Sequence, residues 1–317
     1  MKKIILLSLL CGSLAMGAPA KKVALMMSNR SNEFFGILEK SFVNEAEKLG
    51  YKVDVYDAAN DATKQPSQVE DAIVKGSSAI VINPLNKDAT EGVLNDAISR
   101  DIPIITVDTS VEGVDILADI ATDNEDGGKF AAEWIVKKSN INPEELTGII
   151  HMKGIDGHTA HISRYKGFND YLLSEAAGQK WNELANDSKR YIELTGNFAQ
   201  DVAQNVLESK LSALDNKGKY IVYNENDVMA IGTIGAIMND SRFDLTNFTI
   251  IGFDGSSEGK KLVDEKKMAI TVVQDFQFIG KQAAIVMDEY LTKKKSPENT
   301  IIPIEVVMYP ESQNPRY

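Results

Sequence analysis

Short apolar runs alternate with amphipathic segments along this chain, and this alternation restricts the fold more than any other feature of the sequence. Most of the runs are uninterrupted and rich in Val and Ile. Strands of this kind are typical of parallel sheets that are covered on both faces. The predicted strands are 23–27, 51–55, 79–82, 102–107, 148–150, 220–223, 248–253 and 269–273.

Amphipathic helices are predicted between these strands. Over 34–49 apolar residues recur at helical spacing, and Gly50 follows in the position of a C-cap. Repeated alternation of strand and helix predicts an α/β protein built from doubly wound parallel sheets. Further helices are predicted over 88–100, 127–138, 200–214, 227–239 and 278–293.

The first twenty residues have the pattern of a secretory signal peptide. Two lysines precede an apolar run over 4–10, and Ala18-Pro19-Ala20 offers the small residues of a cleavage site. The run is too short for a permanent anchor, so we predict export and cleavage after Ala20. An uncleaved segment is disfavoured because no polar helical face recurs. A lipid anchor on Cys11 is disfavoured by the bulky Leu10 before it.

Removal of this leader leaves 297 residues, enough for two domains with separate cores. Lys2 and Lys3 lie in the leader, so 32 of the 34 basic residues remain against 46 acidic ones, for a net charge of −14. Such a surface repels phosphate backbones, so no nucleic-acid partner is expected. Cys11 is the only cysteine and leaves with the leader, which excludes disulfides and thiolate metal sites.

The loops that follow the predicted strands are the candidate site, because ligands of doubly wound sheets bind beyond the carboxyl ends of the strands. Nearly every such loop ends in Asn, Asp, Gln or Arg. These planar groups can form two hydrogen bonds in one plane with neighbouring hydroxyls, which sugars and polyols present. Phe34, Phe35 and Phe198 can stack on the apolar C–H face of a sugar ring.

Eight short motifs occur in order along the chain: Asn32-Glu33-Phe34-Phe35, Glu47-Lys48-Leu49-Gly50-Tyr51, Ile82-Asn83-Pro84, Ile102-Pro103-Ile104, Thr122-Asp123-Asn124 with Gly127-Gly128, Asn226-Asp227 with Met229-Ala230 and Gly232, Gly252-Phe253-Asp254-Gly255, and Gln274. With these motifs the chain resembles the periplasmic sugar-binding proteins of ABC transporters, of the ribose- and galactose-binding type. The resemblance extends from Val23 to about Val307.

The resemblance implies a set of sugar-contact positions. An arginine and a histidine of the galactose type match Arg164 and His158. The other contact positions fall on Asn32, Phe34, Phe35, Asp108, Phe198, Asn226, Asp254 and Gln274.

At some positions the residue differs from those of both types. The sequence therefore leaves the identity of the ligand open among tetritols, pentitols, inositols, pentoses and hexoses. The ribose type has arginines at Thr109 and Ile162, which argues against ribose in particular. Glu33 matches an acid of the galactose type, but Ala160 replaces a second aspartate. Glu33 and Thr109 are therefore included as candidate ligand contacts. The alternating aspartates of a calcium loop are missing over 138–146, so no metal or cofactor is expected.

The resemblance also implies a domain organisation and a mechanism. After the signal peptide (1–20), the first lobe comprises 21–122 with 275–303 and the second 123–274 with 304–317, joined by a hinge of three segments. The resemblance implies that the two lobes close around the ligand by a hinge motion, as they do in the family. The implied partners of this periplasmic monomer are an ABC permease and its ATPase in the inner membrane, with a chemoreceptor as a further option.

Structural roles compete with ligand contact at several positions. Asn32 could simply cap the helix that follows it, Asp254 could belong to an ordinary turn, and Arg164 could anchor its loop. Adjacent helical residues cannot both face one core, so we expect at least one of Phe34 and Phe35 to face the cleft.

The three histidines could suggest a zinc site. His158 and His161 could share a helix face, but no acidic or sulfur ligand lies close by in sequence, and His151 belongs to a strand. We therefore prefer His158 as a hydrogen-bonding partner of the ligand.

Three other functions compete with an ABC binding protein. A secreted hydrolase or carbohydrate-active enzyme is disfavoured because no Gly-x-Ser-x-Gly elbow is present, so no catalysis is expected. A transcriptional regulator would need an N-terminal pair of DNA-reading helices, where this chain has a leader and a strand. A receptor for autoinducer-2 or a sugar, used in chemotaxis or signalling, remains an alternative.

Overall fold

The computed structural model describes residues 21–31 and 33–315 of the chain. The predicted signal peptide with Ala20 and Cys11, and the candidate contact Asn32, lie outside the described residues. None of the helices in the described ranges is long and apolar enough to cross a membrane.

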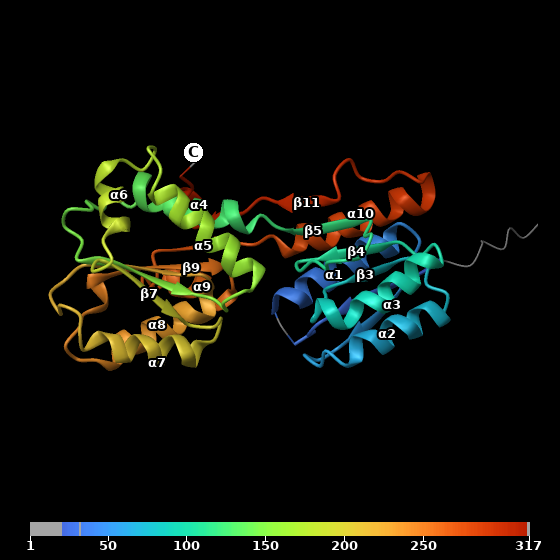
Figure 1. The fold of residues 1–317 in the computed structure, drawn as a ribbon, viewed down its shortest axis with the longest axis horizontal. Helices are drawn as coiled ribbons and strands as arrows, with labels where there is room; N and C mark the ends of the chain where they lie inside the picture. Colours follow the sequence, from blue (N-terminus) through green and yellow to red (C-terminus); the bar gives the residue numbers. More distant parts are fainter. Residues whose placement is uncertain (1–20, 32, 316–317) are drawn as a thin grey trace, which may run out of the picture.

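The described residues form two six-stranded sheets, and we call each sheet with its helices a lobe (Figure 1). The strands of the first sheet are β1 (Lys22–Met27), β2 (Lys52–Asp57), β3 (Ile80–Ile82), β4 (Ile104–Val107), β5 (Ala118–Thr122) and β11 (Ile301–Ile304). The strands of the second sheet are β6 (Gly148–Lys153), β7 (Tyr191–Thr195), β8 (Tyr220–Asn224), β9 (Phe248–Asp254), β10 (Ile270–Val273) and β12 (Val307–Tyr309).

The strand orders are β11-β5-β4-β3-β1-β2 in the first sheet and β12-β10-β9-β8-β6-β7 in the second. Over the described ranges every pairing is parallel except that of β10 with β12. Because the strand order differs from the sequence order, both sheets are doubly wound. The predicted fold class is therefore confirmed.

Helices cover both faces of each sheet. The first lobe has α1 (Glu33–Lys48) and α10 (Phe276–Lys293) on one face and α2 (Lys64–Val74) and α3 (Lys87–Ser99) on the other. The second lobe has α4 (Asn124–Lys137), α5 (Thr159–Leu172) and α6 (Gln179–Asn186) on one face, and α7 (Gln200–Leu211), α8 (Asp227–Asn239) and α9 (Ser257–Asp264) on the other. Two short 3₁₀ helices are η1 (Leu245–Asn247) and η2 (Glu311–Gln313).

Strand β1 shows why the strands read as continuous apolar runs. Successive side chains of a strand point to opposite faces. Val23 and Leu25 pack against α1 and α10, whereas Ala24 and Met26 pack against α2 and α3. Because helices cover both faces, both sets of side chains are buried.

The predicted end of α1 is also confirmed. Gly50 has φ +90°, a left-handed conformation that glycine adopts without strain. The N–H of Tyr51 donates to the carbonyl of Ala46 at 3.0 Å, which closes the last turn.

Within the described residues the chain passes between the lobes at three places. These crossings lie between β5 and α4, between β10 and α10, and between β11 and β12. The first and third are joined by a hydrogen bond of 3.0 Å from the N–H of Asp123 to the carbonyl of Ile304. In Figure 1 the lobes lie side by side, with these segments between them.

Several elements were not predicted from the sequence: β5, β7, β11, β12, α2, α5, α6 and α9. Strand β11 carries Pro303 at a sheet edge, and β7 is a half-exposed edge strand, so neither has the continuous apolar pattern. Helix α5 buries polar His161 and Arg164 on the face that packs inward, which hides its apolar periodicity. Arg164, expected in a loop, therefore lies on a helix.

Candidate functional site

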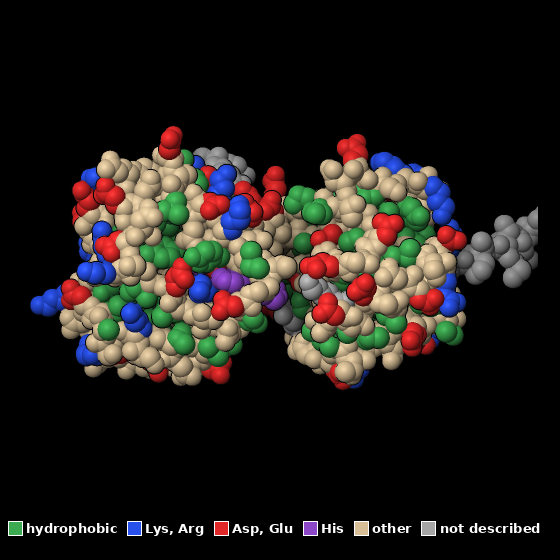
Figure 2. All heavy atoms as spheres, in the orientation of Figure 1, with side chains coloured by type: hydrophobic (Ala, Val, Ile, Leu, Met, Phe, Trp, Pro, Cys, Tyr) green, Lys and Arg blue, Asp and Glu red, His purple; other side chains and the backbone are tan. Residues whose placement is uncertain are grey.

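A cavity of about 370 Å³ lies between the two lobes, where Figure 2 shows a furrow. Each strand from β1 to β10 ends at or shortly before a residue of the cavity wall, as expected for this kind of sheet. The wall consists of Ser28, Phe34, Phe35, Asn60, Asn83, Pro84, Leu85, Asp108, Thr109 and Phe276 from the first lobe and Asn124, His158, Thr159, Ala160, Arg164, Phe198, Asn226, Asp254 and Gln274 from the second lobe and the crossings.

Three phenylalanine rings form an apolar part of the wall on the first lobe. The rings of Phe34 and Phe276 lie 5.0 Å apart between centroids, and Phe35 meets Phe276 edge-on at 6.2 Å. Both Phe34 and Phe35 reach the cavity, so the expectation that at least one faces the cleft is confirmed. Phe276 was not predicted as a wall residue.

Asp108 is the acidic group of the first lobe. Its carboxylate accepts hydrogen bonds from Asn83 Nδ2 at 3.2 Å and from Thr109 Oγ1 at 3.1 Å. Burial raises the pKa of Asp108, and the Thr109 hydroxyl and the Arg164 charge partly oppose this effect. The site therefore holds an acceptor whose negative charge is only partly compensated.

Arg164 is held by close packing of α5 on α4. A Cβ on Gly128 would lie 2.1 Å from the carbonyl oxygen of Arg164, so the two helix backbones touch. The guanidinium lies 3.7 Å above the centroid of the Phe253 ring and donates from Nε to Asn124 Oδ1 at 2.8 Å. Its Nη1 donates to the backbone carbonyl of Glu225. These contacts fix the plane of the guanidinium.

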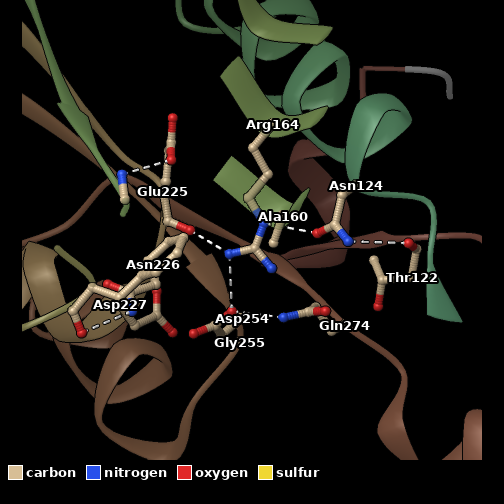
Figure 3. Close-up of polar contacts among 12 residues, drawn as sticks. Thr122, Asn124, Ala160, Arg164, Glu225, Asn226, Asp227, Asp254, Gly255 and Gln274 are labelled. Carbon is tan, nitrogen blue, oxygen red and sulfur yellow. Dashed lines mark hydrogen bonds and ion pairs between the residues drawn. The ribbon is translucent and has the colours of Figure 1, made fainter. Parts of the chain in front are cut away.

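Asp254 lies next to Arg164 in the cavity wall (Figure 3). Arg164 Nη1 lies 3.5 Å from Asp254 Oδ1, which also accepts from Gln274 Nε2 at 2.7 Å. Burial raises the pKa of Asp254 to about 7, because the attraction of Arg164 is offset in part by the nearby carboxyl of Asp227.

Phe198 and His158 form the aromatic part of the second lobe's wall. Their rings meet edge to face with centroids 5.4 Å apart. A Cβ on Gly154 would lie 2.1 Å from Phe198 Cζ, so the ring rests directly on the glycine. His158 also caps α5, accepting from the N–H of Ala160 at 3.2 Å, and burial followed by the Arg164 charge lowers the pKa of its imidazole.

Four wall residues have positive φ angles. The φ angles are +61° at Asn60, +65° at Asp108, +55° at Phe198 and +113° at Asp254. Non-glycine residues in this region cost on the order of 1–3 kcal/mol each and concentrate at functional sites. The strain therefore supports the cavity as the functional site.

Asn226 belongs to the cavity wall, and the next residue, Asp227, supports the wall from within the lobe. Asn226 caps α8 by accepting from the N–H of Met229 at 2.8 Å, and it also lines the cavity. Buried Asp227 accepts from Ser256 N and Oγ, both at 2.8 Å, and from Thr271 Oγ1 at 2.7 Å. Burial raises the pKa of Asp227 to about 6. Asp227 thereby anchors the loop that carries Asp254.

Ten of the twelve candidate contacts line the cavity: Phe34, Phe35, Asp108, Thr109, His158, Arg164, Phe198, Asn226, Asp254 and Gln274. Glu33 does not, because its carboxylate points across the gap between the lobes and accepts from the backbone N–H of Ser257 at 3.3 Å and from its hydroxyl. Asn32 lies outside the described residues.

Several wall residues were not predicted as contacts. Asn83 and Asn124 stand inside the motifs quoted for the resemblance, immediately after β3 and at the start of α4, so position after a strand could have identified them. Ser28 follows β1 immediately and carries the same signal, whereas no local pattern marks Asn60 or Thr159. In the part of the chain that the structure describes, no group of three or more His, Cys, Asp or Glu residues could hold a metal ion.

Comparison with known proteins agrees with this geometry. A family model described as a periplasmic binding protein domain matches residues 23–295. The ribose import binding protein of Salmonella typhimurium is 31% identical over 286 residues, covering 90% of both chains. That of Bacillus subtilis is 31% identical over 284 residues, covering 90% of this chain and 86% of the relative.

Solved structures share the fold. The myo-inositol binding protein of Caulobacter, bound to myo-inositol, has a TM-score of 0.73 at 25% identity, covering 90% of this chain and 92% of that one. A periplasmic ribose ABC transporter structure from Conexibacter woesei has a TM-score of 0.78 at 19% identity, covering 92% and 93%. The chain therefore belongs to the periplasmic binding protein family.

Proposed function

We propose that this chain binds one monosaccharide or polyol in the interlobe cavity and delivers it to an ABC permease. The observation that carries the proposal is the wall itself, in which aromatic rings stand beside planar polar groups such as Arg164, Asp254 and Asp108. Rings suit the C–H face of a sugar, and planar groups suit its hydroxyl edges. A volume of about 370 Å³ suits a small ligand. Like its family, the chain is a binding protein and not an enzyme.

The two lobes would close on the ligand. A ligand that touches Asp108 on the first lobe and Asp254 on the second binds the closed arrangement more tightly, and so shifts the population toward it. We propose that 21–122 with 275–303 and 123–274 with 304–317 move as two bodies. Ile304 is better assigned to the first of these, because it ends β11.

The cellular setting follows from the sequence and the family. We propose that the chain is exported, cleaved after Ala20, and acts in the periplasm as a monomer. The closed form would be recognised by an ABC permease whose ATPase drives import. A chemoreceptor would be a second partner that binds the same closed form.

The ligand class is supported by relatives that are named for ribose import and by a structure that contains myo-inositol. Thr109 and Ala160 line the cavity at positions where the ribose and galactose types carry charged side chains. These differences favour a ligand other than ribose or galactose. Autoinducer-2 is the alternative outside simple sugars and polyols, and turnover of a ligand would favour a carbohydrate-active enzyme instead.

A thermal-shift panel tests this function. The mature protein is screened against pentoses, hexoses, tetritols, pentitols, inositols and autoinducer-2, because a ligand that binds the folded state raises the melting temperature in proportion to ln(1 + [L]/Kd). We expect a clear shift with one or a few polyhydroxy compounds and none with Asp254→Ala. A shift with autoinducer-2 alone would favour the signalling receptor, and no shift with any compound would contradict the proposal.

A further inference from the structure

Glu225 is a fully buried carboxylate between β8 and α8 that does not belong to the cavity wall. It accepts hydrogen bonds from three other segments: His151 Nε2 on β6 at 2.9 Å, His161 Nδ1 on α5 at 2.8 Å, and the N–H of Gly154 between them at 2.8 Å. Burial raises its pKa, but the bonds from His151 and His161 outweigh burial and hold the pKa at about 2. The carboxylate is therefore ionised.

Three wall residues, Arg164, Phe198 and Asn226, lie directly against Glu225 or against the Gly154 that it binds. Figure 3 shows the backbone carbonyl of Glu225 facing the Arg164 guanidinium, while its carboxylate lies on the far side, toward Gly154. Gly154 in turn supports the Phe198 ring at a distance that leaves no room for a Cβ. The residue after Glu225 is Asn226, which lines the cavity.

We propose that Glu225 is a positioning residue, which holds Arg164, Phe198 and Asn226 in the geometry that binds the ligand without touching the ligand itself. The proposal rests on the proposed function in assuming that the cavity holds the ligand. One carboxylate joins β6, α5 and the segment between them to the end of β8. Its removal would free several wall residues together.

Glutamine can keep this network and alanine cannot. In Glu225→Gln the new amide can donate to His151 Nε2 if the imidazole proton moves to Nδ1, which faces the hydroxyl of Tyr191 at 2.8 Å. The hydroxyl then accepts from Nδ1 and donates its own proton to Asn169 Oδ1. The amide oxygen still accepts from Gly154. In Glu225→Ala two imidazoles and a buried N–H lose their partner beside a void.

The first readout needs no ligand. We would record the Arg Nε–H resonances of the ligand-free protein by NMR and assign Arg164 from Arg164→Lys. We expect a sharp, slowly exchanging Nε–H in the wild type and in Glu225→Gln, and a shifted and rapidly exchanging one in Glu225→Ala. His161→Ala, which removes one of the three links, should show a smaller change and serves if Glu225→Ala does not fold.

The second readout is calorimetric titration of the same variants with the compound found in the thermal-shift panel. We expect Kd within about three-fold of the wild type for Glu225→Gln, raised about ten-fold or more for Glu225→Ala, and raised less for His161→Ala. Leu184→Ala is the control, since this buried residue of α6 does not line the cavity and its loss should lower the melting temperature without changing Kd.

The two readouts separate this inference from the proposed function. If no compound binds the wild type, the proposed function fails, and the Nε–H resonance still decides whether Glu225 positions Arg164. If folded Glu225→Ala or His161→Ala keeps the wild-type Arg164 resonance, or binds the ligand with unchanged Kd, the positioning role is overturned.

Discussion

Arg164 and Asp254 face one another inside the cavity, with Nη1 3.5 Å from Oδ1 and side chains only 6% and 12% exposed. Their separation is longer than a good hydrogen bond, so each keeps bonding capacity for a third group. A ligand hydroxyl on the cavity side could bridge the pair, accepting from the guanidinium and donating to the carboxylate. This pair is the polar centre of the proposed site.

Substitution of Arg164 should weaken binding strongly. Arg164→Ala removes the cationic partner of the buried Asp254, which keeps its hydrogen bond from Gln274, and we expect about a 100-fold rise in Kd. Arg164→Lys keeps the charge but loses the planar contacts to Asn124 and Phe253, so about a ten-fold rise is expected. Calorimetric titration measures both. Lys166→Ala, an exposed change on the same helix, is the matched control and should leave Kd unchanged.

The raised pKa of Asp254 predicts a pH dependence of stability without ligand. An acid whose folded pKa rises from 3.8 to about 7 stabilises the fold fully below pH 4 and loses this contribution as pH rises through 7. Asp254→Asn mimics the protonated form at every pH. The free energy of unfolding of Asp254→Asn minus that of the wild type should therefore increase by a few kcal/mol from pH 4 to pH 8. Urea denaturation at each pH measures this difference. A difference that stays flat would mean that folding does not shift the pKa of Asp254, and one that reverses would mean that folding lowers it; either result would contradict the prediction.

The contact between Gly154 and Phe198 predicts a steric effect on binding. In Gly154→Ala the new methyl group would overlap the ring, which must leave its place in the cavity wall. We expect about a ten-fold rise in Kd by fluorescence or calorimetric titration. Gly92→Ala is the control, because a Cβ there meets nothing within 4 Å and the helix gains a better helix former. Equal Kd values for the two variants would show that Phe198 does not contribute to ligand binding.

The contact of Glu33 with Ser257 predicts an effect on closure that does not depend on which ligand is bound. It joins the first turn of α1 to the first turn of α9 across the lobes. We expect Glu33→Ala and Ser257→Ala each to raise Kd about two- to five-fold, to the same extent for every bound compound, and the double variant to add nothing further. If Glu33→Ala alone changed the preference among compounds, Glu33 would contact the ligand directly.

Much of the fold could be predicted because it depends on local patterns. Runs such as 23–27 are apolar at every position only where helices cover both faces, and Gly50 marks a helix end by its own backbone freedom. Edge strands such as β11 and β7 were not predicted, because most of their side chains are partly or fully exposed and the apolar pattern is interrupted. Helix α5 escaped because polar His161 and Arg164 occupy its inward face.

The site could be predicted as far as it follows strand ends. Asp108 and Gln274 come directly after apolar runs and Asn226 follows one within three residues, so topology alone brings them together. The orientation of Glu33 could not be predicted, because its side chain is held by Ser257 of α9, more than 200 residues away in sequence. The role of Glu225 escaped for the same reason, since all its partners come from other segments.

The central claim is that both lobes hold one small polyhydroxy ligand at once. Its most direct test is a calorimetric titration of the wild type, Asp108→Ala and Asp254→Ala with the compound found in the thermal-shift panel. We predict one site per chain in the wild type and a loss of affinity of about 100-fold or more in each variant, although the two side chains belong to opposite lobes. Full affinity in either variant would mean that one lobe holds the ligand alone, and would contradict the account.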